Sequence, residues 1–157
     1  MRRLKRVPDG CRQGFTLIEL LVTIAVALIL LAVAIPAWKS LVSGSRLASM
    51  TDLLQTGYRT ARTEAIKTTS TMTLQPASGA DWNSGWIVTN TAKQVVWRSG
   101  SLPAGVSISV PVGVSQVQIL GSGISQQAGA FTVTTDSGSR SMCLVISGQS
   151  YLGNGSC

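Results

Sequence analysis

The sequence contains no histidine and only six acidic residues, and these absences exclude several classes of chemistry. Without histidine there can be no histidine-dependent acid–base catalysis and no histidine-ligated metal site. The acidic residues are scattered, and none of them form a cluster with the spacing of a calcium loop. We therefore predict that the protein is not an enzyme and holds neither a metal nor another cofactor.

Charged residues make up only 12% of the chain, and the net charge of +7 is unevenly distributed. Five of the basic residues lie before position 15: Arg2, Arg3, Lys5, Arg6 and Arg12. Without residues 1–14 the chain keeps eight basic and five acidic residues, a net charge of +3. That mild basic balance is not by itself the signature of nucleic-acid binding. Basic residues ahead of an apolar segment instead hold an N-terminus in the cytoplasm.

A long apolar run from Leu17 to Ile35 contains a single charged residue, Glu19. Residues 15–35 are long enough to span a bilayer at ~1.5 Å per residue. A carboxylate at the mouth of such a span is costly and usually marks a function. Pro36 interrupts the run, but the helical pattern resumes after it, which favours a kink over a helix end.

Apolar residues recur at helical spacing beyond this proline, at Leu47, Met50, Leu54, Tyr58, Ala61 and Ala65. This amphipathic pattern extends the helix, which we predict to run from about Phe15 to Lys67. From Thr69 the period changes to two, as in strands. The expected strands lie at 71–74, 86–88, 95–97, 106–110, 112–119, 131–133 and 142–146, with 86–88 and 95–97 forming a hairpin. We expect a flexible loop from Gly121 to Gly129 and an α+β fold.

The residues Gly14-Phe15-Thr16-Leu17-Ile18-Glu19 closely resemble the prepilin-peptidase signal of type IV pilins and type II secretion pseudopilins. This resemblance implies cleavage between Gly14 and Phe15, followed by N-methylation of Phe15. It also implies that Glu19 pairs with the Phe15 amine, its own or that of a neighbouring subunit, and so docks subunits in register. Pro36 matches the proline that kinks the helix inside such fibres.

Four later segments resemble the GspH/FimT branch of this superfamily: residues 46–67, 81–88, 102–106 and 143–147 with the final Cys157. The branch implies a pilin fold, in which one long helix packs on an antiparallel β-sheet domain, and a disulfide between Cys143 and Cys157. Cys11 would leave with the leader, so an even pair of cysteines remains. Two free thiols are the alternative.

These observations predict three regions. Residues 1–14 form a cleaved prepilin leader, residues 15–42 a transmembrane and assembly helix, and residues 43–157 a periplasmic globular domain with an amphipathic helix at 45–67. The expected function is that of a minor pilin or pseudopilin that joins or primes a type IV pilus or a type II secretion pseudopilus. Its expected partners are other pilins, the prepilin peptidase and the bacterial inner membrane, with the C-terminus in the periplasm.

The sequence leaves two alternative functions open. A minor pilin that binds DNA would use the candidate cations Lys93, Arg98 and Arg140. Some DNA-binding members of the branch carry a Gly-Arg-x-Arg element near the C-terminus, and the matching residues 148–153 lack both arginines. A secreted protein with an ordinary signal peptide would be cut after Ala32-Val33-Ala34 and begin at Ile35.

Two groups of residues also have two interpretations each. Trp82, Trp86 and Trp97 are expected to pack a hairpin or a helix onto a sheet, although aromatic residues also stack on sugars. Arg59 and Arg62 are expected on a solvated helix face or, alternatively, in an interface between subunits.

Overall fold

The computed structural model describes residues 15–154 and residue 157. Helix α1 spans Leu17–Thr68, and the elements described after it, up to residue 154, are all strands. These strands are β1 (Met72–Ser78), β2 (Asp81–Thr89), β3 (Val95–Arg98), β4 (Ser107–Ser109), β5 (Val117–Ile119), β6 (Gly129–Thr135), β7 (Gly138–Leu144) and β8 (Ser150–Gly153). The chain divides into two compact units, and the division falls between Trp38 and Lys39.

The first unit contains the N-terminal part of α1. Within α1, one 18-residue window has a mean hydropathy of 2.9, and no residue of that window is buried. By length and composition, the helix could therefore cross a membrane. The helix begins and ends within two residues of the predicted bounds, and Pro36 lies inside it. The kink predicted at this proline stays a prediction.

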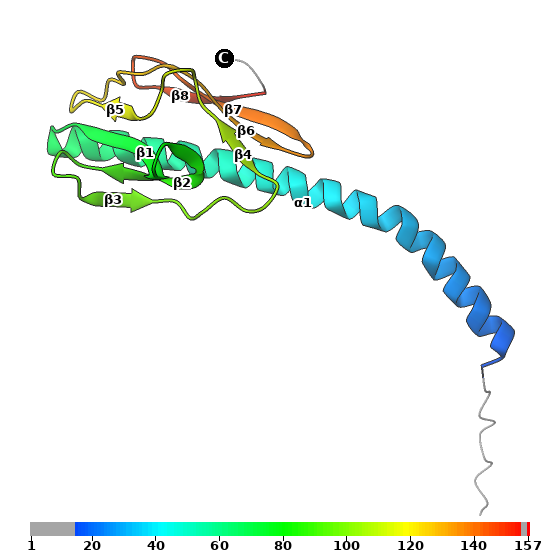
Figure 1. The fold of residues 1–157 in the computed structure, drawn as a ribbon. Helices are drawn as coiled ribbons and strands as arrows, with labels where there is room; N and C mark the ends of the chain where they lie inside the picture. The colour runs from blue at the N-terminus through cyan, green and yellow to red at the C-terminus, as the bar shows by residue number, and fades with distance from the viewer. Residues whose placement is uncertain (1–14, 155–156) are drawn as a thin grey trace, which may run out of the picture. The chain divides into compact units, whose positions relative to one another are not determined.

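The second unit contains two four-stranded sheets with the strand orders β3-β2-β1-β5 and β4-β6-β7-β8 (Figure 1). All strand pairs are antiparallel, and the predicted hairpin is formed by β2 and β3, with Val88 opposite Trp97. The α+β class is thus confirmed, and its β portion is divided between two sheets. Strand β5 pairs with β1, which is far away in sequence. The period of apolar residues predicts that a segment is a strand, but not which strand it pairs with.

Three local predictions about the strands were wrong. Val112 was expected in a strand, but it lies in a turn and is fully exposed. Strand β7 ends at Leu144, so Ile146 is outside it and 65% exposed. The short strand β8 was missed because Ser150–Gly153 has no alternating apolar pattern and forms only by pairing with β7.

The segment from Gly121 to Gly129 was expected to be flexible, but the structure anchors it. Ser125 is fully buried and forms an antiparallel bridge with Ile119. Its backbone N–H donates to the Ile146 carbonyl at 3.1 Å, and the Gln126 N–H donates to the Gln118 carbonyl at 2.9 Å. This segment therefore covers the open edge of β5, where unpaired backbone groups would otherwise face solvent.

The core lies between α1 and the two sheets, and the tryptophans belong to it. Trp82 of β2 meets Phe131 of β6 edge-to-face, with ring centroids 5.5 Å apart, and so connects the sheets. Trp86 is fully buried, and the partly buried Trp97 packs against the same core. The packing interpretation of these residues is confirmed. The largest fully buried side chains also include Tyr58, Leu54, Leu74, Ile119, Met142 and Val88.

At Gly57, α1 lies close to two tryptophans of the core. A Cβ atom placed there would lie 2.7 Å from Trp97 Cζ3 and 3.0 Å from Trp86 Nε1. Gly57→Ala is therefore expected to lower the free energy of unfolding by about 1–3 kcal/mol, despite alanine's better helix propensity. Urea unfolding followed by tryptophan fluorescence measures this change.

Gly44 provides the matched control for this prediction, because it lies in the same helix and a Cβ there would have nothing within 4 Å. Gly44→Ala is expected to leave stability unchanged or to raise it by up to about 1 kcal/mol. Equal effects of the two substitutions would contradict the close packing at Gly57.

Candidate functional site

The N-terminal end of α1 is fixed by a side-chain cap. The backbone N–H of Glu19 donates to Thr16 Oγ1 at 3.3 Å, and the N–H of Leu20 donates to the Thr16 carbonyl at 3.1 Å. Thr16 is thus the N-cap residue, and Glu19 occupies the third helical position. The Thr-x-x-Glu spacing is that of a capping box, a signal of a helix start that four adjacent residues carry. It starts the helix directly after Phe15.

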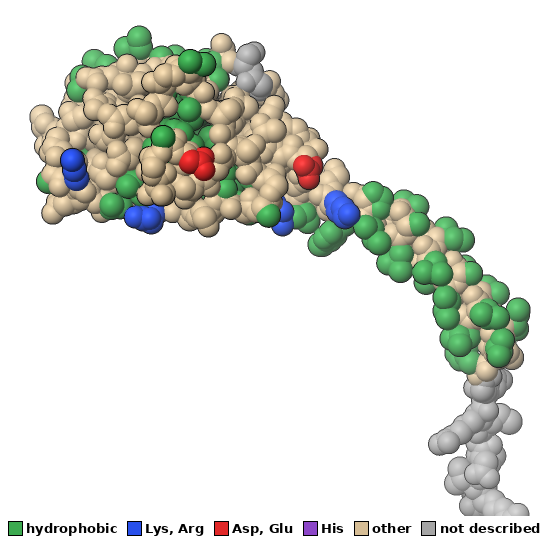
Figure 2. All heavy atoms as spheres, viewed as in Figure 1, with side chains coloured by type: hydrophobic (Ala, Val, Ile, Leu, Met, Phe, Trp, Pro, Cys, Tyr) green, Lys and Arg blue, Asp and Glu red, His purple; other side chains and the backbone are tan. Residues whose placement is uncertain are grey.

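The helix that follows this cap exposes its apolar side chains. Phe15 is 75% exposed and Leu17 is 76% exposed, and large apolar residues remain about half exposed or more through Ile35. In Figure 2, hydrophobic side chains cover the visible face of this part of the chain. An apolar surface of this length is not stable in water. It must therefore be covered by lipid or by other protein chains.

Glu19 lies within this apolar surface and is itself exposed. It forms no ion pair with any residue that the structure describes. Its position in the first turn is favourable for a carboxylate because the helix dipole is positive there. The pairing of Glu19 with a Phe15 amine remains a prediction, and Gly14 lies outside the described residues.

The three candidate DNA-contacting cations are on separate elements. Lys93 lies in the β2–β3 turn with a φ of +61°, and Arg98 ends β3. Strand β3 alone places about 10 Å between its two ends. Arg140 lies in β7, in the other sheet. The three residues thus come from one turn and two strands, and their contact with DNA stays a prediction.

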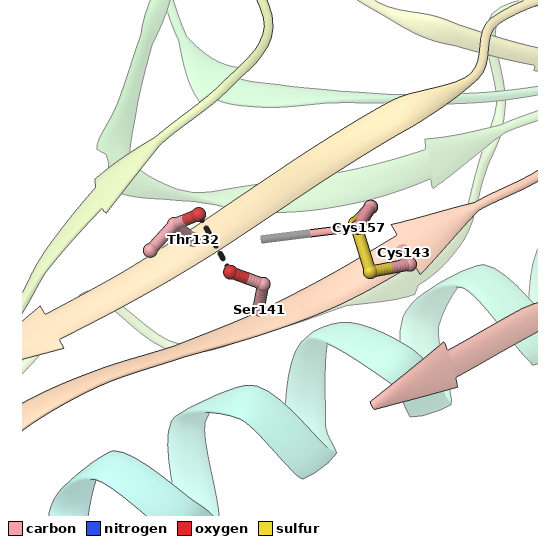
Figure 3. The surroundings of a disulfide bond; sticks show 4 residues. All are labelled: Thr132, Ser141, Cys143 and Cys157. Carbon is pink, nitrogen blue, oxygen red and sulfur yellow. Dashed lines mark hydrogen bonds between the residues drawn. A yellow bond between two sulfur atoms is a disulfide. The ribbon is translucent and has the colours of Figure 1, made fainter. Parts of the chain in front are cut away.

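A disulfide joins Cys143 and Cys157, with their Cα atoms 5.5 Å apart (Figure 3). Cys143 is fully buried in β7, and the closed loop contains all of β8. Beside it, the hydroxyls of Thr132 and Ser141 are 2.8 Å apart and connect β6 to β7 (Figure 3). In the chain-entropy model, closing a loop of this length stabilises the fold by about 3 kcal/mol.

A pocket of about 280 Å³ lies between α1 and the turn that leads into β8, and sequence reasoning missed it. We call it the arginine pocket. It is lined by Tyr58, Arg59 and Arg62 of α1 and by residues 148–151. Helical spacing predicts Arg59 and Arg62 on an exposed helix face, but only the fold shows that β8 lies opposite them.

Two contacts shape the arginine pocket. The Nε–H of Arg62 donates to the Gly123 carbonyl at 3.0 Å, and the amide of Gln55 donates to the Ser150 carbonyl at 3.5 Å. Burial raises the pKa of Tyr58 above its ordinary value of 10, while the nearby Ser125 hydroxyl and the charge of Arg62 oppose that shift. Tyr58 is therefore a neutral part of the pocket wall at physiological pH.

A larger hollow of about 580 Å³ is lined mainly by threonine and glutamine residues in and next to β1, β2 and β5 of the first sheet. Its only charged lining residue is Lys93. Within residues 15–154 and 157, no group of His, Cys, Asp or Glu residues is placed to hold a metal ion.

Comparisons with known proteins agree with this geometry. Residues 51–150 match the family model of the type II transport protein GspH, and residues 10–35 match the prokaryotic N-terminal methylation motif. A search of curated proteins found no match.

Two crystal structures of the type IV minor pilin FimU from Pseudomonas aeruginosa PAO1 are similar in fold. The first has a TM-score of 0.62 at 16% identity and covers 69% of this chain and 89% of its own. The second has a TM-score of 0.54 at 19% identity and covers 68% of this chain and 92% of its own.

Proposed function

We propose that this chain, which belongs to the GspH family of type IV pilin-like minor pilins and pseudopilins, is cut between Gly14 and Phe15 and then joins or primes a helical fibre. The observation that carries the proposal is the exposed apolar helix from Leu17 to Ile35, which follows the methylation motif and contains Glu19 as its one charge. The proposed role is structural and involves no reaction.

The apolar surface of the helix would be covered in two successive environments, first by lipid and then by other subunits. In the bacterial inner membrane, lipid covers residues 17–35 while the second unit remains in the periplasm. In the pilus or pseudopilus, helices of other subunits replace the lipid, because packed helices bury the same apolar surface. The Phe15 ammonium of one subunit then neutralises Glu19 of another, and this pairing offsets the cost of removing both charges from water.

We do not propose DNA binding, because phosphate contacts require several convergent cations. Lys93, Arg98 and Arg140 lie on separate elements, and the Gly-Arg-x-Arg element is replaced by residues 148–153 without arginine. The secretory alternative predicts a different mature N-terminus, Ile35.

The mature N-terminus is therefore the decisive measurement. We expect N-terminal sequencing and mass spectrometry of the membrane-extracted protein to find Phe15 carrying one additional methyl group. Gly14→Val should abolish cleavage, because a branched side chain obstructs the close approach of an enzyme to the backbone. Gly10→Val changes another leader glycine and should be processed normally. A native chain that begins at Met1 or at Ile35 would contradict the proposal.

A further inference from the structure

The arginine pocket is built around a cation that lacks a counter-charge. Arg62 is half buried, and its Nε–H is taken by the Gly123 carbonyl. Within the described residues, its two terminal nitrogens form no hydrogen bond, and the only ion pair joins Lys67 to Glu64 at 3.0 Å. No acidic residue lines the pocket. A half-buried guanidinium in such surroundings is stabilised by an oxyanion, which its planar fork binds through two parallel hydrogen bonds.

The walls of the arginine pocket are held in place before any ligand arrives. Gly148 is buried against the Gly123 carbonyl, the same group that orients Arg62. The disulfide closes the loop that contains β8, and Gln55 attaches β8 to the helix. A preformed pocket of this kind loses little entropy when it binds a small group.

The size of the arginine pocket identifies the kind of occupant. About 280 Å³ is just below the usual range of small-molecule sites, so the hollow itself has room for one small anionic group. Only two cations, Arg59 and Arg62, converge there. Tyr151 on the rim is 50% exposed and offers an apolar contact for the methylene groups of an acidic side chain.

We propose that the arginine pocket binds the carboxylate of an acidic side chain presented by a partner subunit. The inference rests on the proposed function, since that function supplies the partner as another subunit of the fibre. Arg62 is the bidentate anchor, and the exposed Arg59 contributes a second charge from the same helix face.

The test is a titration of the full-length protein in detergent micelles with two blocked tripeptides, acetyl-Gly-Glu-Gly-amide and acetyl-Gly-Gln-Gly-amide. Binding is followed through the backbone amide resonances of Gly123 and Gly148. We expect the glutamate peptide to bind with a dissociation constant on the order of 1 mM, and the glutamine peptide not to bind. Arg62→Gln should weaken binding about tenfold or more, the effect of losing a charged hydrogen-bonded pair.

Arg59→Gln provides a second variant that leaves the Arg62–Gly123 contact intact, and it should weaken binding several-fold. Arg98→Gln removes an exposed arginine outside the pocket and should bind like the wild type. The proposal is overturned if the glutamate peptide causes no shifts, if Arg62→Gln binds it unchanged, or if only inorganic phosphate or a single-stranded oligonucleotide binds. Failure of the proposed function would instead appear as a wrong mature N-terminus, which this titration does not measure.

Discussion

Gly148→Ala is expected to destabilise the second unit by roughly 3 kcal/mol or more. Gly148 has a φ of +79°, a conformation that residues with a Cβ atom adopt only at a cost. A Cβ atom at this position would also overlap the carbonyl oxygen of Gly123. Because that oxygen belongs to backbone anchored by Ser125 and Arg62, it has little room to move. Urea unfolding followed by tryptophan fluorescence should therefore show a much lower midpoint.

A substitution at Gly105 distinguishes the two causes of the expected destabilisation, the positive φ and the overlap with the Gly123 carbonyl. Its φ of +80° matches that of Gly148, but a Cβ atom there would have nothing within 4 Å. Gly105→Ala should therefore cost only the conformational penalty, about 1–2 kcal/mol. If Gly148→Ala were no worse than Gly105→Ala, the close contact between the β7–β8 turn and the segment around Gly123 would be refuted.

Glu19→Ala is expected to reduce the amount of this subunit in purified fibres by about a hundredfold, while cleavage and membrane insertion continue. The substitution removes the carboxylate proposed to neutralise the Phe15 ammonium of a neighbouring subunit. Leaving one charge of a buried pair without its partner costs about 3 kcal/mol or more. Quantitative immunoblotting of sheared fibres and of membranes measures the ratio between the two pools.

Glu64→Ala is the matched control, because Glu64 is an acidic residue of the same helix whose partner is Lys67, in an ion pair on the surface. Its loss should cost at most about 0.5 kcal/mol and leave incorporation unchanged. Normal incorporation of the Glu19→Ala protein would disprove the docking role, and a defect of equal size in both variants would point to altered helix stability.

Much of the long helix could be predicted from local sequence. Its first half is uniformly apolar and long enough to span a bilayer, and its second half has apolar residues at helical spacing. The buried residues Leu54, Tyr58 and Ala61 are those that the spacing indicated. The start of the helix at the Thr16 cap was predictable as well, since the Thr-x-x-Glu pattern depends on four adjacent residues.

The second sheet, β8 and the arginine pocket could not be predicted in the same way. The second sheet needs β4 to pair with β6, which is distant along the chain, and the pocket depends on contacts between distant residues, such as Gln55 with Ser150 or Arg62 with Gly123. Residues 149–153 have no strand pattern, and Arg62 resembles any solvated arginine on a helix. Pairing with β7 places β8 opposite the helix, and the two arginines then line a pocket together with residues 148–151.

The sequence by itself determined the family, the exposed apolar helix with its lone carboxylate, and the cysteine pair, because these follow from composition and from residues close together along the chain. Only the tertiary structure decided how the strands divide between two sheets and which side chains line the pocket beneath β8. Those features arise when distant segments bury one another, and the choice among such pairings depends on packing that no local pattern records.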